Sequence, residues 1–318
     1  MRRALIAPFS LVLAALAAAP ASSSSSGKGT AAAAFLRLTP GARASALGGA
    51  YGAVEGDSLA THYNPAGLGL LDRVEAAGGH EARFEGLSYD YAVLSAPVLA
   101  WTDKTRRVSD YGTAAVSVYS LSASGIERRG LVETDAAAGT FGAADRAYAL
   151  SYGVAVPGAK LALGAAAKLV ESSLDSARAT ALTADLGALW RFGDWTAAGG
   201  VRNAFGRLRL GSYADSLPFV AYGAASWRRG QWLAVAEADL PRQDAMILSC
   251  GSEYRVRAAP GLSAAARAGW RSERRDAGGL GGVSFGFGAS WRGLDGDFSW
   301  MPGGRLGDVM QYSMKAGF

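Results

Sequence analysis

The sequence predicts an all-β protein, a transmembrane antiparallel β-barrel of about 14 strands with an N-terminal hatch, or plug, inside its lumen. Three observations support this prediction. Apolar side chains alternate with period two from Asp72 onward, the connections are short on one side and longer on the other, and the last alternating segment ends at Phe318. Successive side chains of a strand point to opposite faces, so this alternation gives each strand one apolar face.

The N-terminus has the form of a secretory signal. Arg2 and Arg3 precede an apolar run from Leu5 to Ala18, and Ala19-Pro20-Ala21 supplies a small-residue cleavage pattern. The run is shorter than the ~20 residues of a spanning helix, which favours cleavage over anchoring. The predicted location is therefore the bacterial outer membrane. The predicted segments are a signal peptide at 1–21, a flexible linker at 22–34, the hatch at 35–71 and the barrel at 72–318.

The composition argues against several classes of protein. The chain has 318 residues and a net charge of +5, and its basic residues form no long run, so no nucleic-acid partner is expected. A single cysteine, Cys250, allows no internal disulfide. With only two histidines in addition, neither a metal site nor a cofactor is expected.

Fourteen segments alternate. In 178–191, for example, Leu182, Leu186 and Trp190 share one face, and Thr183 and Asp185 share the other. Such strands suit a soluble sandwich with a buried apolar face or a membrane barrel whose apolar face meets lipid, and periodicity alone does not choose. The predicted strands are 74–82, 87–100, 111–122, 145–156, 160–171, 178–191, 194–202, 218–228, 231–240, 245–257, 261–271, 280–291, 294–301 and 308–318.

Connection length favours the barrel, because membrane barrels have short turns on the periplasmic side and longer loops outside. The ten-residue connection 101–110 is the exception on the short-turn side. The short turns are 157–159, 192–193, 229–230, 258–260 and 292–293, and the long loops include 123–144, 203–217 and 272–279.

Tryptophans near the strand ends also favour a barrel, because indole rings prefer the boundary between lipid and water. The alternative is that they pack in the core of a soluble domain. The predicted interface residues are Trp190, Trp195, Trp227, Trp232 and Trp291 at the short-turn end and Trp270 and Trp300 at the other.

The last strand is similar to the assembly signal of outer-membrane barrels. Tyr312, Met314 and Phe318 share its apolar face, and Phe318 is the terminal residue. An even strand number lets this strand pair antiparallel with the first, so that no edge faces lipid. The expected partners are outer-membrane lipid and the barrel-assembly machinery.

If the apolar side chains of each strand face lipid, the alternate side chains point into the lumen. This assigns the charged side chains of those positions, Asp90 among them, to the lumen. Acidic and basic residues on neighbouring strands are predicted to form a ladder across the inner wall. The alternative is that they are solvated charges worth under about 1 kcal/mol per pair. The ladder residues are Glu237, Asp239, Glu253, Arg255, Arg257, Arg267 and Arg271.

The hatch segment lacks the period-two alternation of the strands. Asn64 suits a helix N-cap and Pro65 the first helical position, which predicts a short helical turn at Ala66–Leu71. Gly48 and Gly49 allow close approach to the wall, and Arg43, Glu55 and Asp57 are candidates for pairing with lumen charges.

Gly56-Asp57-Ser58-Leu59 matches the nucleophile motif of one hydrolase family. Serine chemistry needs a histidine base that a third group orients, and no histidine follows His80, where that family's base would lie. The sequence therefore predicts a non-enzymatic protein.

Gly41-Ala42-Arg43, Leu47 to Tyr51 and His62 to Leu68 resemble the N-terminal signature of the PorV/PorQ group of FadL-like outer-membrane barrels. Thr39-Pro40 departs from that pattern. The resemblance implies a 14-stranded barrel with an N-terminal hatch, and either passage of hydrophobic molecules or carriage of cargo proteins in type IX secretion. The implied hatch residues are Phe35, Arg43, Gly48, Gly49, Tyr51, Asn64, Pro65, Ala66 and Gly67.

The predicted function is thus a channel for a small hydrophobic ligand or a secretion accessory. The alternatives are a structural barrel, or a module that binds secreted proteins through loops 123–144 and 203–217. A dry apolar pocket beside the hatch would favour passage, and a lumen packed with salt bridges would count against it. Whether the hatch is a plug or a gate stays open.

Overall fold

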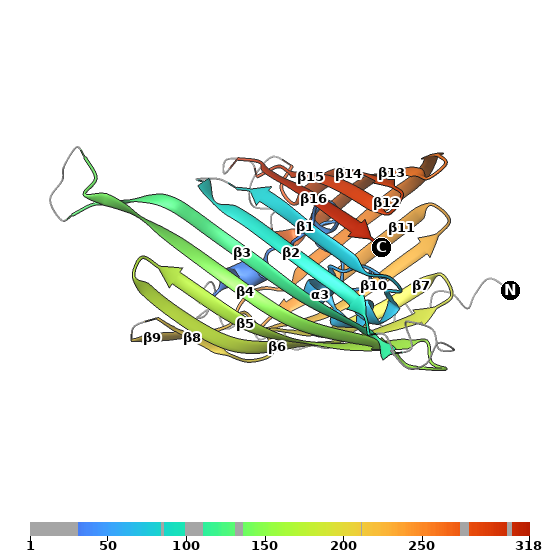
Figure 1. The fold of residues 1–318 in the computed structure, drawn as a ribbon, viewed down its shortest axis with the longest axis horizontal. Coiled ribbons are helices and arrows are strands. Elements are labelled where there is room, and N and C mark those ends of the chain that lie inside the picture. Colours follow the sequence, from blue (N-terminus) through green and yellow to red (C-terminus); the bar gives the residue numbers. More distant parts are fainter. Residues whose placement is uncertain are drawn as a thin grey trace.

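The protein folds as a closed antiparallel barrel of 14 strands (Figure 1), which confirms the predicted fold class. The computed structural model describes residues 31–83, 86–98, 111–130, 136–210, 212–273, 280–303 and 307–318. The barrel strands are β1 (Glu75–Ala82), β2 (Ser88–Pro97), β3 (Thr113–Arg128), β4 (Gly139–Ala155), β5 (Leu161–Leu174), β6 (Ala177–Phe192), β7 (Trp195–Arg202), β10 (Val220–Arg229), β11 (Trp232–Pro241), β12 (Ile247–Ala259), β13 (Leu262–Arg271), β14 (Val283–Trp291), β15 (Leu294–Met301) and β16 (Val309–Gly317).

The first and last strands close the sheet. β1 and β16 pair antiparallel, with Glu75 opposite Gly317 and Ala82 opposite Met310. Every barrel strand therefore has two hydrogen-bonded neighbours, and no strand edge is left along the wall. This closure is what a spanning sheet requires, because lipid cannot satisfy free backbone groups.

The apolar faces of the strands point outward. On β6, Leu182, Leu186 and Trp190 are 64%, 55% and 57% exposed, whereas Thr183 and Asp185 are buried in the lumen. A sandwich would bury the apolar face, so the exposed apolar face identifies a barrel that spans the outer membrane.

The longest hairpin corrects one predicted loop. Residues 123–144 were expected to form a loop, but β3 continues to Arg128 and β4 already begins at Gly139. Their hairpin projects beyond the other strands at the left of Figure 1. The register shifts between Ala123 and Ile126, and Gly125 has a positive φ of 71°. This irregularity breaks the period-two pattern, which explains why the sequence did not reveal the strands.

The expected loop 203–217 also contains regular structure. β8 (Arg207–Leu210) and β9 (Tyr213–Ser216) form a separate two-stranded sheet that contacts β6. The predicted connection at 101–110 and the predicted signal at 1–21 lie outside the described residues.

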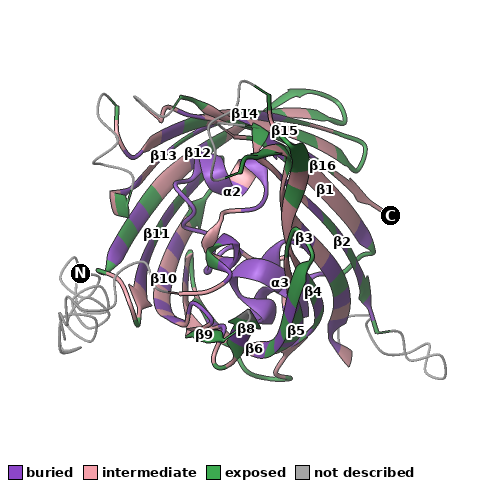
Figure 2. Cartoon of the chain, turned by 90° about the vertical axis from the view of Figure 1, so that its left-hand side faces the viewer, coloured by how far each residue is buried: buried purple, intermediate pink, exposed green. Residues whose placement is uncertain are grey.

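The N-terminal segment lies inside the barrel (Figure 2). Its short helices are η1 (Ala34–Arg37), α2 (Ala42–Ala46), α3 (Ala60–Tyr63) and η2 (Pro65–Leu70). In the described part of the chain, no helix is long and apolar enough to cross a membrane. Ala42, Ala44, Ala46 and Leu68 have no exposed surface, so strands surround this segment on all sides. It is called the hatch below.

Glycines in the wall let the hatch backbone lie directly against the strands. A Cβ at Gly153 on β4 would lie 2.7 Å from the amide nitrogen of Gly69, and one at Gly164 on β5 would overlap Pro65 and Ala66. On the opposite wall, a Cβ at Gly251 would lie 2.7 Å from the Cα of Leu47. Side chains at these positions would hold the hatch away from the wall. The glycines therefore form the surface on which the hatch packs, which is called the glycine seat below.

Candidate functional site: the hatch and the inner wall

The hatch divides the lumen into a charged half and an apolar half. On the charged side, one carboxylate of β11 holds the hatch backbone. Glu237 Oε2 accepts hydrogen bonds from the amides of Tyr51 at 3.0 Å and Gly52 at 2.8 Å. Glu237 Oε1 accepts a third from Arg202 of β7 at 2.6 Å. Because its partners come from the hatch and from β7, this β11 carboxylate joins three segments of the chain.

A second carboxylate, Glu253 of β12, lies between two arginines. It accepts from Arg43 of the hatch at 2.8 Å and from Arg267 of β13 at 2.7 Å, and Arg267 also donates to Asp297 at 2.7 Å. The side chains of Glu253 and Arg267 are each 1% exposed. Two guanidinium groups therefore share the carboxylate of Glu253, and each has a second acidic neighbour, Asp297 for Arg267 and Asp57 for Arg43.

The other residues of the predicted ladder have different surroundings. Arg271 lies 3.5 Å from Asp239, which also accepts from Arg202 at 3.1 Å. Arg255 lies 3.5 Å from Glu253, whereas Arg257 is exposed and makes no ion pair with a described residue. The structure thus brings the predicted ladder residues other than Arg257 into ion pairs, and the hatch contributes Arg43 to them.

Asp57 links the hatch to the last strand. It accepts from Tyr51 Oη at 2.8 Å and from Lys315 of β16 at 3.2 Å, and Arg43 lies 3.3 Å away. Burial alone would raise the pKa of Asp57, but the charges of Lys315 and Arg43 outweigh burial and hold it well below its usual range. Asp57 is therefore a permanent anion in the hatch.

The predicted turn at Asn64 is confirmed. Asn64 Oδ1 accepts from the amide of Ala66 at 3.1 Å, so it caps the 3₁₀ helix η2, whose first residue is Pro65. Its Nδ2 donates to the carbonyl oxygens of Gly52 at 2.8 Å and Ala188 of β6 at 3.2 Å. One side chain thus ends one hatch turn, begins another and fastens both to the wall.

The apolar half lies against β2 to β6, where β5 and β6 also carry one buried ion pair, Lys168–Asp185. Phe35 and Leu36 of η1 are 2% and 6% exposed and belong to a buried cluster with the wall. The wall members of this cluster include Tyr89, Tyr91, Val93, Tyr119 and Val170, and Leu208 and Leu217 join it from β8 and from the segment that follows β9. This half is lined as a site for an apolar molecule would be, and the chain's own side chains fill it.

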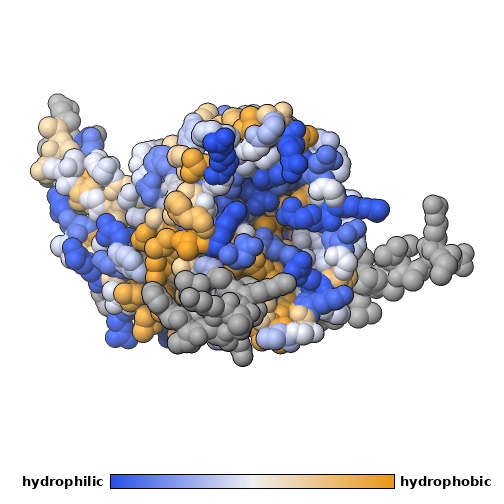
Figure 3. Space-filling model, turned by 45° about the vertical axis from the view of Figure 1, so that its right-hand side comes forward, coloured by the Kyte–Doolittle hydropathy of each residue, from blue (hydrophilic) through white to orange (hydrophobic). Residues whose placement is uncertain are grey.

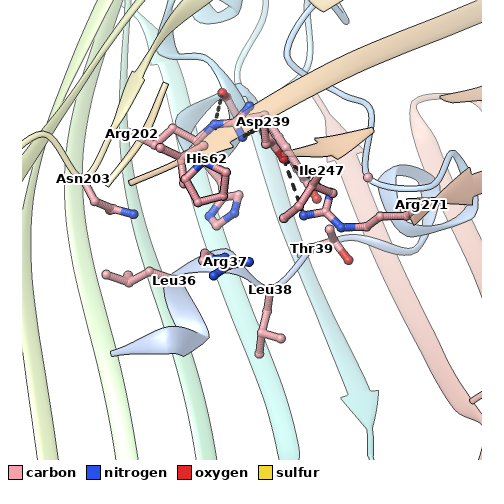
Figure 4. A pocket seen from close by; sticks show the side chains of 14 residues that line it. Leu36, Arg37, Leu38, Thr39, His62, Arg202, Asn203, Asp239, Ile247 and Arg271 are labelled. Carbon is pink, nitrogen blue, oxygen red and sulfur yellow. Dashed lines mark hydrogen bonds and ion pairs between the residues drawn. The ribbon is translucent and has the colours of Figure 1, made fainter. Parts of the chain in front are cut away.

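The remaining space beside this segment is small. A cavity of about 30 Å³ lies between the stretch from Leu36 to Thr39, His62 and the wall residues Arg202 and Asp239 (Figure 4). About 30 Å³ is one water's share of liquid volume. The ion pairs of Asp239 with Arg202 and with Arg271 border it, so no open route passes the hatch at this point.

His62 makes the hatch sensitive to acid. Burial, together with the charges of Lys168 and Arg202, lowers the pKa of His62 well below 6.5. The folded state keeps the imidazole neutral while the unfolded chain takes up a proton, so stability falls as the pH drops through 6.5. We expect a loss of up to about 1.4 kcal/mol per pH unit in urea unfolding, and a smaller slope in His62→Gln. Equal slopes in the two proteins would contradict this assignment.

The sequence missed part of the site. Lys168 and Asp185 form a buried ion pair of 2.5 Å, and Asn203 donates its amide to Asp185 at 2.8 Å. Alternation along each strand already placed both charged side chains in the lumen. Their pairing, however, depends on the register of β5 with β6. Asp90 was wrongly assigned to the lumen, because it lies on the outer face beside His80 at 2.7 Å.

The hydrolase-like motif has no accessible nucleophile. Ser58 is fully buried, and its amide donates to Glu75 at 3.1 Å. No substrate reaches its hydroxyl in this fold. The described residues also contain no group of three or more side chains placed to hold a metal ion.

The remaining predicted residues lie on the outside of the barrel. Trp190, Trp232 and Trp291 are 57%, 50% and 53% exposed at the short-turn end. Trp195 and Trp227 are cross-strand neighbours there with ring centroids 6.4 Å apart, Trp270 and Trp300 lie toward the other end, and Tyr312, Met314 and Phe318 are 52%, 70% and 80% exposed. Their roles in lipid contact and assembly stay predictions.

These features define a class: an outer-membrane β-barrel with an apolar exterior and an N-terminal hatch. Residues 10–195, more than half of the chain, match the model of the uncharacterised protein family UPF0164. The chain therefore belongs to this family. No curated protein matches it.

Solved structures with the same fold are FadL-like barrels. The toluene transporter TbuX of Ralstonia pickettii aligns with a TM-score of 0.55 and 13% identity, over 87% of this chain and 98% of TbuX. A FadL homologue of Pseudomonas aeruginosa gives 0.52 and 10%, over 86% and 96%. The toluene transporter TodX of Pseudomonas putida gives 0.51 and 12%, over 86% and 95%. At these identities the likeness shows the fold alone.

Proposed function

We propose that the protein is a channel for small hydrophobic compounds and a member of the PorV/PorQ group, with the hatch as its gate. One observation carries the proposal: the apolar half of the lumen is occupied by Phe35 and Leu36. A hydrophobic compound that replaced them would meet the same aromatic and aliphatic wall. Their apolar contacts can be exchanged for those of a ligand with little loss of buried area.

The segment that carries these two side chains has few polar anchors. The amide of Ala32 donates to the carbonyl of Ser216 at 3.1 Å, and Arg37 pairs with Asp244 and Glu273. Glu273 is 41% exposed, so its ion pair is weak. By contrast, the hatch from Ala42 onward bonds to buried groups of the wall. Thr39 is held, since its carbonyl oxygen accepts from Ser45 Oγ at 2.8 Å and from Gln311 Nε2 at 3.3 Å. Movement of residues 31–38 alone would therefore open the apolar half and leave the rest of the hatch seated.

The similar solved structures support the ligand class. TbuX and TodX are described as toluene transporters, which are channels for a small apolar aromatic molecule. The salt bridges on the charged side count against passage there, and the buried Lys168–Asp185 pair does so at β5 and β6, so the route follows β2 to β4.

The substitution Phe35→Ala tests this proposal. It removes the competing side chain, so toluene should bind the purified barrel about tenfold more tightly than it binds the wild type. Isothermal titration calorimetry measures the affinity. Phe205→Ala is the matched control, because Phe205 is 59% exposed and outside the apolar cluster. Equal toluene affinity in Phe35→Ala and the control would refute the proposal.

A second candidate is the type IX secretion accessory that the PorV/PorQ resemblance implies. Two aromatic side chains near β8 and β9, Phe205 and Tyr213, are 59% and 79% exposed and offer a surface for a secreted protein. Replacing residues 207–216 by a short Gly-Ser linker would then abolish release of secreted proteins. If release continued unchanged, this candidate would be excluded.

A further inference from the structure

A second, larger cavity of the barrel opens at the end that carries the short turns. It has a volume of about 270 Å³ and lies beneath the hatch, between Arg43, Asp57, Arg228, Arg255 and Lys315. Figure 3 turns this end toward the viewer and shows hydrophilic residues gathered around it. In barrels of this kind the short-turn end faces the periplasm. At about 30 Å³ per water, the cavity has room for about nine waters or a small solute.

Basic side chains outnumber acidic ones in its lining. Arg43, Arg73, Arg228, Arg255 and Lys315 are the basic lining residues, and Asp57, Asp295 and Asp297 are the acidic ones. Two further carboxylates contact these cations from behind the lining: Glu253 contacts Arg43 and Arg255, and Glu75 contacts Arg73 and Lys315. Asp297 is already bonded to Arg267. The nearby carboxylates therefore already have basic partners.

Arg228 is the basic lining residue that has no such acidic partner. No carboxylate of the described residues lies within ion-pair distance of it, although its side chain lines the cavity. Arg255 reaches Glu253 only at 3.5 Å, and Glu253 is shared with Arg43 and Arg267. Two guanidinium groups on β10 and β12 thus face the cavity with unused donors. Arginine presents a planar set of donors that matches phosphate and carboxylate oxygens.

Arg228 is exposed at the mouth of the cavity, and comparison with the neighbouring residue shows that its side chain is directed to the lumen side of the wall. Arg229 is next in sequence, but its side chain is 75% exposed and lies 3.9 Å from Asp194. It is absent from the cavity lining, as alternation along β10 requires.

We propose that this cavity is a binding site for a phosphate group that enters from the periplasmic side, with Arg228 and Arg255 as its main ligands. The phosphate is carried by a soluble solute or by a phospholipid headgroup. Its negative charge supplies the partner that Arg228 lacks, and the cavity beneath the hatch supplies the space. The channel proposal rests on Phe35 and Leu36, which do not line this cavity, so the two proposals are tested separately.

Titration of the full-length barrel with inorganic phosphate tests the site, with Arg229→Gln as the matched control. Wild type and Arg229→Gln should bind with the same affinity, and Arg228→Gln should bind at least about tenfold more weakly. Arg255→Gln should also weaken binding. Failure of the wild type to bind phosphate, or equal affinity in Arg228→Gln, would overturn the assignment. Heat-modified mobility on gels confirms that each variant is folded.

The source of the phosphate group is resolved by repeating the titration in nanodiscs. Phosphatidylglycerol discs should weaken the binding of inorganic phosphate relative to phosphatidylcholine discs if a lipid headgroup competes for Arg228. Unchanged affinity assigns the site to a soluble solute. Either outcome retains Arg228 as the phosphate ligand.

Discussion

Replacing Glu253 by alanine is expected to lower the free energy of unfolding by about 3 kcal/mol, because Arg267 and Arg43 lose the carboxylate they share and keep only Asp297 and Asp57. Arg267 is 1% exposed and Arg43 is 12% exposed, and both donate to Glu253. Urea-induced unfolding of the detergent-solubilised barrel, followed by tryptophan fluorescence, measures the loss. The hatch should become protease-sensitive at the same time, since the ion pair of Arg43 with Glu253 is one of the contacts that hold it against the wall.

The matched control for this substitution is Glu127→Ala. Glu127 pairs with Arg129 at 2.7 Å, but the two side chains are 56% and 51% exposed. An exposed pair contributes under about 1 kcal/mol, so this variant should unfold almost as the wild type does. If Glu253→Ala were no less stable than Glu127→Ala, the charged half of the lumen would not be holding the hatch.

The substitution Gly164→Val is expected to unseat the Asn64 end of the hatch. A side chain at this position would overlap the backbone of Pro65 and Ala66, and backbone cannot move aside as a flexible side chain can. Liposomes containing the variant should become permeable to a small polar solute such as glucose, as swelling assays measure. Gly296→Val is the control, because a Cβ at Gly296 meets nothing within 4 Å. A glucose-tight Gly164→Val barrel would show that the hatch does not need this glycine seat.

The sequence predicted the features that depend on local periodicity and capping. Alternation in segments such as 178–191 predicted the barrel, and Asn64-Pro65 predicted the turn that the structure confirms. These patterns are local, because a strand face or a cap is defined within a few residues. The β3–β4 hairpin was missed where Gly125 interrupts the alternation.

The error at Asp90 has a more general cause. On β2, Tyr89, Tyr91 and Val93 face the lumen, so the apolar face there is the inner one. The hatch makes this half of the lumen apolar, and strand periodicity alone cannot distinguish such a lumen from lipid. For the same reason, the sequence did not reveal that Phe35 fills an apolar site. The cluster that contains Phe35 joins residues separated by more than a hundred positions.

The permeability of liposomes that contain the full-length wild-type barrel is the most direct test of the hatch-closed lumen. If the hatch fills the lumen as the contacts at Glu237, Asn64 and Gly164 indicate, glucose should enter these liposomes no faster than it enters protein-free ones. A swelling rate well above that of protein-free liposomes would contradict a closed lumen.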